Sequence, residues 1–251
     1  MTQAKKTITA AVLVIGDEIL SGRTKDKNIG YIADYLADIG IDLCEVRVVA
    51  DEEQDIVDAV NALRRRYTYL FTTGGIGPTH DDITADSVAK AMGVPLYEDE
   101  RIIKLMLERL KPEDMNEARR RMARIPVGAE HVENKISKVP GFKIENVIVM
   151  AGVPSIMQAM LDAVAPRLET GAKMIVETLE SVGVPEGEYA KGLGEIAASF
   201  AGVSIGSYPS FGEGRFKNNI VVRGKDSAQV SAALAAVAAM LEPLRAAREQ
   251  S

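Results

Sequence analysis

The chain has 251 residues, of which 47% are hydrophobic and 26% are charged. This composition is ordinary for a globular protein, and the length suits one or two domains with a full hydrophobic core. The formal net charge of −6 argues against a nucleic-acid-binding protein, which normally carries a basic face. The single cysteine, Cys44, excludes an intramolecular disulfide and a metal site built from several thiolates.

The N-terminal apolar run does not have the features of a signal peptide. It is short, lacks a small-residue cleavage site and is interrupted by Asp17 and Glu18, so we interpret it as a core strand. No stretch reads as long enough to span a bilayer. We therefore expect a cytoplasmic protein that contacts neither membrane nor nucleic acid.

The first third of the chain alternates strand and helix patterns. Apolar runs with the length of strands lie at residues 9–16, 42–50 and 67–73, and helical periodicity lies at residues 28–40 and 51–66. The first run is continuously apolar, which is typical of a strand buried on both faces. Strands that alternate with helices of this length predict parallel βαβ units in an α/β fold.

The remainder of the chain predicts a second, smaller domain. Helices are expected at residues 82–92, 99–110, 113–125 and 154–168, with a core strand at residues 146–150. A linker near Gly171 is followed by a strand, a helix, two strands and an Ala-rich helix, which predicts a small α+β domain. We expect domains over residues 1–170 and 171–251. Two runs of three arginines, at residues 64–66 and 119–121, are interpreted as solvated helix surface, with an anion contact as the alternative.

Three loops leave the carboxyl ends of predicted strands, where open α/β sheets bind their ligands. The loop after the third strand carries three glycines, Gly74, Gly75 and Gly77. These glycines would let a ligand approach the backbone. Thr79 is placed to cap a helix that begins near Asp82, and free amides at a helix start favour phosphate. Two adjacent carboxylates, Asp81 and Asp82, coexist with phosphate only if a cation is present, and Mg²⁺ prefers such ligands. The pattern predicts a magnesium–phosphate site, and the alternative is a capped turn with solvated aspartates.

Other polar residues are candidates for the same site. Asp17 and Glu18 end the first strand and could be a turn cap or ligands. Asp51 ends the second strand, where it is predicted to cap the following helix and to point to the ligand edge. His80 could contact phosphate or act as a base, and no role is expected for His131.

The motifs in these loops resemble a known family. Residues 16–28, 72–89, 125–142 and 152–157, in this order, resemble the molybdopterin-binding domain of the competence/damage-inducible protein A (CinA) family. Residues 205–211 resemble a motif of the small second domain in CinA proteins, which also occurs in the related domain of eukaryotic FAD synthases. The likeness extends from about residue 8 to about residue 245.

The resemblance implies a fold and several activities. The family's fold is a three-layer α/β/α sandwich with a mainly parallel sheet. CinA-type members are similar to divalent-metal-dependent pyrophosphatases acting on ADP-ribose, and the FAD synthase relatives hydrolyse FAD. Molybdopterin-related members bind a pterin phosphate or adenylylated pterin. Full-length CinA proteins carry a further deamidase domain, and since this chain ends before it we expect a short form without deamidase activity.

The resemblance also assigns residues. Asp82 matches the acidic residue that is essential in molybdopterin-processing relatives, and Asp51 matches their second acidic position. The expected catalytic residues are Asp82, Asp81 and His80. The expected metal ligands are Asp17, Glu18, Asp51 and Asp82. The expected substrate-binding residues are Gly16, Asn28, Gly74, Gly75, Gly77, Thr79, Gly152, Pro154 and Ser155.

The chain departs from the family pattern at four positions. Ala151 replaces a usual proline, and Ile156 replaces a usual glutamate. Ser137 and Val139 replace a usual glycine and alanine. The loss of an acidic side chain near the phosphate edge puts the metal geometry in question.

Three functions follow from these motifs. The leading hypothesis is hydrolysis of a nucleotide diphosphate such as ADP-ribose or FAD with Mg²⁺, Mn²⁺ or Co²⁺, and K⁺ is a further candidate cation. The second is a binder of molybdopterin or its adenylylated form in molybdenum-cofactor biosynthesis. The third is a sensor that binds a nucleotide without turnover. Relatives self-associate, so we also expect a homodimer or another homo-oligomer.

Overall fold

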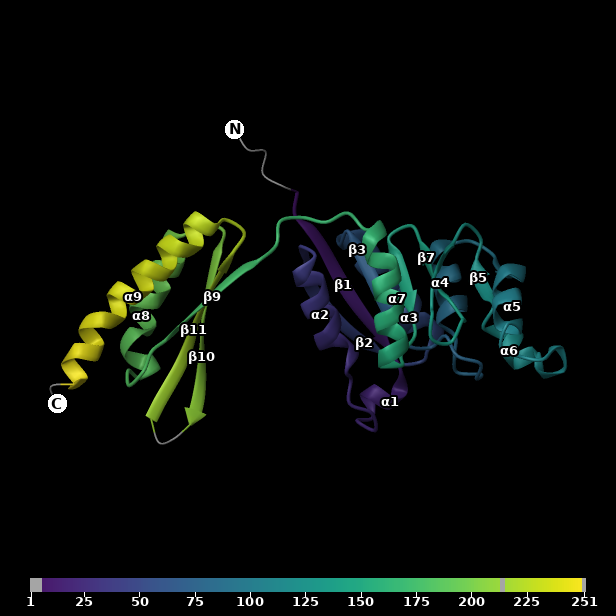
Figure 1. Ribbon diagram of the computed structural model, residues 1–251, viewed down its shortest axis with the longest axis horizontal. Helices are drawn as coiled ribbons and strands as arrows, with labels where there is room; N and C mark the ends of the chain where they lie inside the picture. The colour runs from purple at the N-terminus through teal and green to yellow at the C-terminus, as the bar shows by residue number, and fades with distance from the viewer. Residues whose placement is uncertain (1–5, 213–214, 250–251) are drawn as a thin grey trace. The chain divides into compact units, whose positions relative to one another are not determined.

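The structure is a computed structural model that describes residues 6–212 and 215–249. The chain divides between Gly171 and Ala172 into two compact units. The ribbon in Figure 1 shows the helices and strands of each unit.

The larger unit contains most of the secondary structure. Its elements are β1 (Ile8–Ile15), α1 (Asp17–Leu20), α2 (Asn28–Asp38), β2 (Ile41–Val49), α3 (Glu53–Arg66), β3 (Tyr69–Thr73), α4 (Thr84–Met92), β4 (Leu96–Glu98), α5 (Glu100–Leu107), α6 (Glu117–Arg121), β5 (Arg124–Pro126), β6 (Glu130–Val132), β7 (Gly141–Ile144), β8 (Val147–Met150) and α7 (Pro154–Val164), with 3₁₀ turns at Pro112–Asp114 and Ala165–Arg167.

A six-stranded, mainly parallel sheet organises this unit, as predicted. Its strand order is β2-β1-β3-β8-β7-β6. Strands β2, β1, β3 and β8 run parallel, whereas β7 and β6 are antiparallel to their neighbours. Because three parallel strands end side by side, the loops after β1, β3 and β8 leave the same edge of the sheet.

Helices cover both faces of the sheet, which gives the predicted three layers. Alternate side chains of β1 enter different cores, because successive residues of a strand point to opposite faces. Leu13 and Ile15 pack with the buried faces of α3 and α4, whereas Val12 and Val14 pack with those of α2 and α7. In Figure 1, α2 and α7 lie in front of the sheet.

The smaller unit has the predicted α+β composition. Its elements are β9 (Ile175–Glu180), α8 (Glu186–Ser199), β10 (Val203–Gly212), β11 (Arg215–Gly224) and α9 (Ser227–Glu249). The strands form an antiparallel sheet in the order β10-β11-β9. Side chains of α8 and α9 pack on β11, where Ile220 and Val222 are fully buried.

The expectation that no stretch is long and apolar enough to span a membrane does not hold for one described helix, α9. Residues Ser227–Arg248 of α9 have the length and hydropathy of a membrane span. Its buried residues Val230, Ala233, Val237 and Leu241 recur every three or four positions. This spacing forms one apolar stripe along a helix, and here the stripe packs in the core of the small unit.

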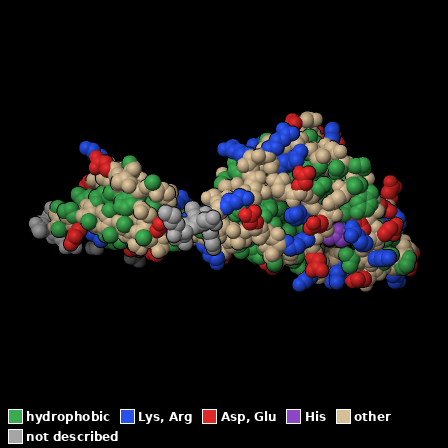
Figure 2. All heavy atoms as spheres, turned by 90° about the horizontal axis from the view of Figure 1, so that it is seen from above, with side chains coloured by type: hydrophobic (Ala, Val, Ile, Leu, Met, Phe, Trp, Pro, Cys, Tyr) green, Lys and Arg blue, Asp and Glu red, His purple; other side chains and the backbone are tan. Residues whose placement is uncertain are grey.

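The charges of the larger unit are mixed on the face seen in Figure 2. Basic and acidic side chains are both present there, and several basic ones lie close together at its upper left.

Tyr189 provides a test of the small core. Its hydroxyl accepts from Asn218 Nδ2 at 2.8 Å and lies 2.9 Å from Ser207 Oγ. Because Asn218 is buried, Tyr189→Phe should lower the free energy of unfolding by about 1–2 kcal/mol. Calorimetric unfolding of the full chain measures this loss. Tyr208→Phe, at an exposed tyrosine, is the matched control and should change stability by less than about 0.5 kcal/mol. Equal effects of the two variants would contradict this account.

Candidate functional site

The loops that follow β1, β3 and β8 meet through their backbones at Gly74. The Gly74 amide donates to Met150 O at 3.3 Å. Gly74 has φ of 100°, and a Cβ on it would lie 2.1 Å from Ile15 O. A Cβ on Gly152 would lie 3.3 Å from the Gly74 Cα. Only glycine allows this conformation and this approach, so Gly74 brings the three loops together.

The carboxylate of Asp82 closes the glycine loop. Oδ1 accepts from the Gly77 amide at 2.6 Å, and Oδ2 accepts from the amide and the hydroxyl of Thr79 at 2.8 and 2.5 Å. A Cβ on Gly77 would lie 2.6 Å from Asp82 Oδ2, which explains the need for glycine there. Asp82 thus holds the loop from residue 77 to residue 82 in one conformation.

The predicted cap at Thr79 is wrong. Helix α4 begins at Thr84, not near Asp82, and its N-terminus shows no side-chain cap. The Thr79 hydroxyl donates to Asp82 instead, because a carboxylate offers two acceptor oxygens close by. The Thr84 amide and hydroxyl are bonded to Gly75 O and Gly74 O, each at 3.0 Å.

Several amides of the glycine loop are therefore already bonded, contrary to the prediction of a row of free donors. The amides of Gly77 and Thr79 donate to Asp82, and that of Asp82 donates to Thr79 O. Within the described chain, the amides of Gly75, Ile76 and His80 have no internal acceptor. Of these residues, Gly75 and Ile76 line a cavity at this edge of the sheet, so their N–H groups are the candidates to bind an anion there.

Acidic side chains gather around Asp51, which is not the helix cap that the sequence predicted. Helix α3 begins at Glu53, after Glu52 as the N-cap residue. Asp51 Oδ2 instead accepts from the Asp17 amide at 2.9 Å, because Asp17 follows the neighbouring strand β1. Burial raises the pKa of Asp51, and the negative charges of Asp17, Glu18 and Asp81 raise it further, while the Asp17 amide opposes them.

The four expected metal ligands do not form one preformed cage. Asp17, Glu18 and Asp51 lie at the ends of β1 and β2, whereas Asp82 is engaged in the glycine loop. Over residues 6–212 and 215–249, no three His, Cys, Asp or Glu side chains are grouped so as to hold a metal ion. Their oxygens are hard donors of the kind that Mg²⁺ prefers, and Mg²⁺ often takes only one or two protein carboxylates.

His80 and Asp81 point to solvent at the tip of the loop. The His80 side chain is 97% exposed, and its Nδ1 lies 3.9 Å from Asp81 Oδ1. The Asp81 side chain is 60% exposed, and an exposed carboxylate is ionised at neutral pH. Asp81 is therefore an accessible negative charge, which also acts on Asp51.

Two adjoining cavities lie at this edge. The main cavity has a volume of about 630 Å³, and the second has about 240 Å³. Both are bounded by Glu18, Thr24, Gly74, Gly152 and Pro154. Of the other expected substrate-binding residues, Gly75 and Gly77 line the main cavity and Asn28 lines the second. Gly16, Thr79 and Ser155 line neither.

Much of the main cavity comes from residues that the sequence did not single out for a ligand. Met122 and Asn134 line it from the region between α6 and β7, and Met160 lines it from α7. The four departures from the family pattern, Ser137, Val139, Ala151 and Ile156, all line it as well. No local motif marks Met122 or Met160, because apolar helix residues are usually core residues.

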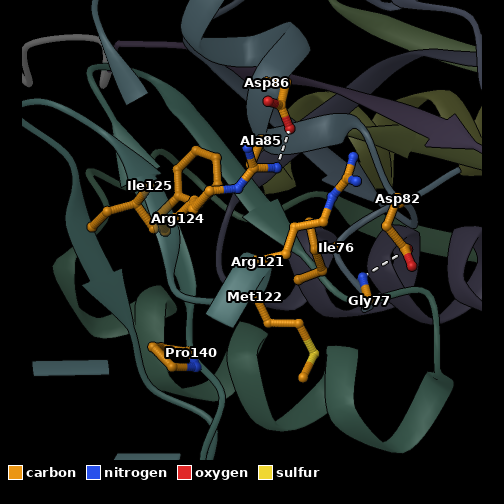
Figure 3. Close-up of a pocket in the computed structure, with 12 residues that line it drawn as sticks. Ile76, Gly77, Asp82, Ala85, Asp86, Arg121, Met122, Arg124, Ile125 and Pro140 are labelled. Carbon is orange, nitrogen blue, oxygen red and sulfur yellow. Dashed lines mark hydrogen bonds and ion pairs between the residues drawn. The ribbon is translucent and has the colours of Figure 1, made fainter. Parts of the chain in front are cut away.

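Arg121 approaches the glycine loop from the other side. It lines a small cavity of about 20 Å³ together with Gly75, Gly77 and Asp82, and Figure 3 shows its side chain extending toward that loop. Its Nε is buried without an acceptor in the described structure. The neighbouring Arg124 pairs with Asp86 at 2.8 Å. Thus one arginine of the 119–121 run, interpreted chiefly as solvated surface, is partly buried beside the candidate site.

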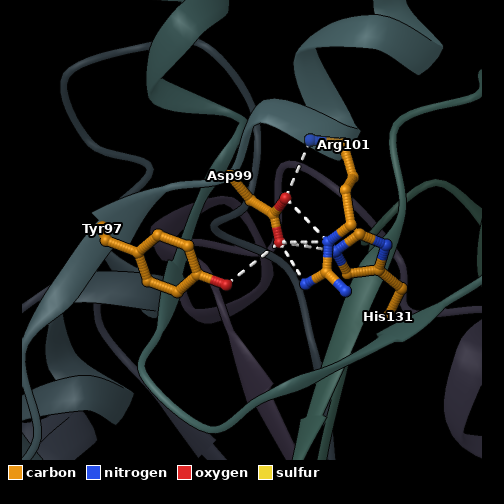
Figure 4. Close-up of polar contacts among 4 residues, drawn as sticks. All are labelled: Tyr97, Asp99, Arg101 and His131. Atoms are coloured by element: carbon orange, nitrogen blue, oxygen red, sulfur yellow. Dashed lines mark hydrogen bonds and ion pairs between the residues drawn. The ribbon is translucent and has the colours of Figure 1, made fainter.

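His131 belongs to a separate polar cluster, shown in Figure 4. Its Nε2 lies 2.9 Å from Asp99 Oδ2, and the same carboxylate accepts from Arg101 and from Tyr97. The Arg101 guanidinium holds the pKa of the buried Asp99 well below its usual range. None of these four residues lines the three cavities at the glycine loop.

Comparison with known proteins places this geometry in a family. Residues 11–170 match the family described as a probable molybdopterin binding domain, and residues 174–250 match the middle domain of FAD synthase. The crystal structure of CinA from Thermoplasma acidophilum, described as of unknown function, is 31% identical. It covers 64% of this chain and 98% of its own, with a TM-score of 0.61.

Two curated relatives show how much of the chain is matched. A protein of Thermococcus kodakarensis is 40% identical over an alignment that covers 63% of this chain and 69% of that protein. The probable FAD synthase of Caenorhabditis elegans is 30% identical over an alignment that covers 93% of this chain and 50% of that protein. The chain spans about half the length of the FAD synthases it matches.

The fold and the site together define an α/β domain with two adjoining cavities at the carboxyl ends of parallel strands. The chain belongs to the molybdopterin-binding-domain family, and its larger unit is CinA-like.

The structural role of Asp82 is testable. Asp82→Ala removes the acceptor of three hydrogen bonds and should lower the free energy of unfolding by about 2 kcal/mol. Urea unfolding measures the loss. Asp81→Ala, which truncates the exposed neighbouring carboxylate, is the control and should cost less than about 0.5 kcal/mol. If the two variants unfold at the same urea concentration, Asp82 does not organise the loop.

Proposed function

We propose that this protein hydrolyses a nucleotide diphosphate, such as ADP-ribose or FAD, with the help of a divalent cation. The observation that supports it is the main cavity, in which a largely apolar wall adjoins the glycine loop and the Glu18 carboxylate. Such a cavity suits a ligand with a flat apolar ring and a charged phosphate part, because pockets combine apolar walls with a few placed polar groups.

The glycine loop would bind the phosphates. The unbonded amides of Gly75 and Ile76 can donate to phosphate oxygens, as backbone N–H groups do in other anion sites. Arg121 adds a positive charge next to the same loop, and guanidinium groups suit phosphate geometry. Fixed donors aimed at developing charge are usually the largest catalytic contribution.

The acidic group at Asp51 would hold the cation. Asp17, Glu18 and Asp51 supply carboxylate oxygens, and phosphate oxygens and water would complete the shell. A bound cation would neutralise charge on the diphosphate. Asp81, which is exposed and ionised, and His80 are the candidates to orient the attacking water. Asp82 would act as a positioning residue through the loop.

The names of two relatives support a nucleotide ligand. Two nematode relatives are named probable FAD synthases, and the small unit matches the middle domain of FAD synthase. Both FAD and ADP-ribose contain an adenosine diphosphate part, so one cavity could accept either compound.

The proposal is tested by product release. The purified chain is incubated with ADP-ribose or FAD and Mg²⁺, Mn²⁺ or Co²⁺, with and without K⁺, and AMP is measured by chromatography. We expect cation-dependent AMP release that stops on addition of a chelator. Absence of AMP from both compounds with every cation would exclude this function.

Asp51→Asn separates catalysis from stability. Asparagine keeps an acceptor for the Asp17 amide but carries no charge, so AMP release should fall by at least about 100-fold. Because the pKa of Asp51 is raised in the fold, ionisation of Asp51 opposes folding as the pH rises through that pKa. Without a cation, Asp51→Asn should therefore melt above the wild type at about pH 8 and lose this advantage at about pH 3, below the ordinary carboxyl pKa.

Glu52→Gln is the matched control for that variant, since Glu52 is the exposed neighbour. It should leave both AMP release and the pH dependence of melting unchanged. If Asp51→Asn releases AMP at the wild-type rate, Asp51 is not a ligand of the cation.

The family description supports a second candidate, binding of molybdopterin or its adenylylated form. The apolar residues Ile76, Met122 and Ile156 of the main cavity could flank a pterin ring. Calorimetry with molybdopterin against ADP-ribose distinguishes the two ligands. Tight nucleotide binding without AMP release would instead indicate a sensor.

The predicted self-association is a separate question, which light scattering on the purified chain tests.

A further inference from the structure

The sheet of the smaller unit has an outer face that neither of its helices covers. Side chains of α8 and α9 pack with Ile205, Ile220 and Val222 on the other face of the sheet, and Figure 1 shows both helices on one side of the strands. Successive residues of a strand point to opposite faces. The residues that alternate with these core positions therefore form the outer face, and they include Val176, Gly206, Tyr208, Val221 and Arg223.

The ring of Tyr208 lies along strand β10 on this outer face. Its hydroxyl accepts from Arg223 Nη2 at 3.2 Å, and Arg223 pairs with Ser204, which precedes Gly206 on β10. The hydroxyl reaches Arg223 because the ring extends back over Gly206. A Cβ on Gly206 would accordingly lie 3.0 Å from Tyr208 Cε2 and 3.1 Å from its hydroxyl oxygen.

This ring explains why residue 206 is a glycine. Gly206 does not have a positive φ, so the strand backbone itself would accept alanine there. The nearest atoms that a Cβ would meet all belong to the Tyr208 side chain. Both residues lie in the motif at residues 205–211. The motif thus builds an aromatic ring that is held flat on the sheet.

The other side of the ring is open to solvent. Tyr208 is 47% exposed, although Gly206 lies beneath one face of its ring. Val221 pairs with Gly206 on the next strand, and Val176, which is 55% exposed, pairs with Arg223. A fixed aromatic ring beside apolar side chains is a stacking surface. Because the ring is already held in place, a ligand that stacks on it loses little of the binding energy to ordering.

Arg223 supplies a positive charge at the border of this surface. Its side chain is exposed, and within the described part of the chain its guanidinium contacts the Tyr208 hydroxyl and no carboxylate. A guanidinium group suits phosphate oxygens. Among the described side chains of the outer face, Arg223 is the one cation. One cation suits a single phosphate, whereas a nucleic-acid strand needs a positively charged groove along its backbone.

We propose that the outer sheet face of the smaller unit binds a planar heteroaromatic ring that carries a phosphate group. The ring stacks on the open face of Tyr208 and extends toward Val221, and the phosphate pairs with Arg223. Flavin mononucleotide (FMN) and AMP both have this chemistry. Neither Tyr208 nor Arg223 lines the three cavities of the larger unit. The site therefore goes beyond the proposed hydrolysis and does not depend on it.

The stacking is tested with FMN, because contact with a tyrosine ring quenches flavin fluorescence. Quenching by the full chain, without a divalent cation, is titrated for the wild type, Tyr208→Phe and Tyr208→Leu. Phenylalanine keeps the ring, whereas leucine keeps an apolar side chain without one. Tyr208→Leu should bind FMN at least about 5-fold more weakly, and Tyr208→Phe should stay within about 3-fold of the wild type. Equal affinities of the two variants would overturn the stacking.

Gly206→Ala tests the flat ring from beneath. The added methyl group displaces the ring, so this variant should lose as much FMN affinity as Tyr208→Leu. In the Tyr208→Leu background the same substitution should have no further effect, because both changes remove one contact. Gly194→Ala is the control, since a Cβ on this helix glycine would meet open space. Losses that add in the double variant would show that Gly206 does not act through Tyr208.

Arg223→Gln separates the phosphate from the ring. It should weaken FMN binding about 3- to 10-fold and leave the binding of riboflavin, which has the same ring without phosphate, unchanged. Equal losses for the two flavins would overturn the phosphate assignment. Competition by AMP identifies the ring: displacement of FMN from Tyr208 extends the site to purines, and its absence restricts the site to flavins.

No quenching by the wild type, or quenching that does not depend on Tyr208, would overturn the proposal. So would an oligomer that Tyr208→Leu converts to a monomer with FMN binding unchanged, because a second copy would then cover this face. FMN binding that follows the expected pattern without AMP release from ADP-ribose or FAD would instead refute the proposed hydrolysis and leave this site intact.

Discussion

The close backbone contact at Gly74 is the constraint on which the candidate site depends. A side chain at this position would collide with the carbonyl of Ile15, so β3 can turn beside β1 only through glycine. The same residue receives Gly152 from the loop after β8. Three loops are thereby held at one edge of the sheet, and both cavities open around this contact. The two cavities are a consequence of parallel strands that end together.

The acidic residues of this edge divide into two kinds. Asp82 is a structural carboxylate, because three donors of its own loop hold it in place. Asp51, Asp17, Glu18 and Asp81 repel one another, and their repulsion contributes to the raised pKa of Asp51. A bound cation, as proposed above, would relieve this repulsion. Loss of function on substitution of Asp82 alone would therefore not identify a metal ligand, since the loop is lost with it.

The main cavity is where this chain differs from the pattern of the family it resembles. Ser137, Val139, Ala151 and Ile156 are far apart in the sequence but line one space. Apolar side chains at Val139 and Ile156 favour ring surfaces over extra charge. The carboxylates near β1 and β2 would therefore have to balance the charge of a cation without the usual glutamate at position 156. Arg121 would balance the charge of a phosphate.

The sequence by itself determined the parallel α/β core, the small α+β unit and the loops that carry the site, because period and glycine placement are local signals. It also marked Gly74 and the acidic pair at residues 81 and 82. Only the tertiary structure decided that Asp82 bonds its own loop, that Asp51 accepts from Asp17 rather than capping a helix, and that Arg121 reaches a cavity beside the glycine loop. Each of these depends on distances between segments that are remote in the chain. A carboxylate or a hydroxyl has several possible partners, and the fold selects among them by bringing one within reach.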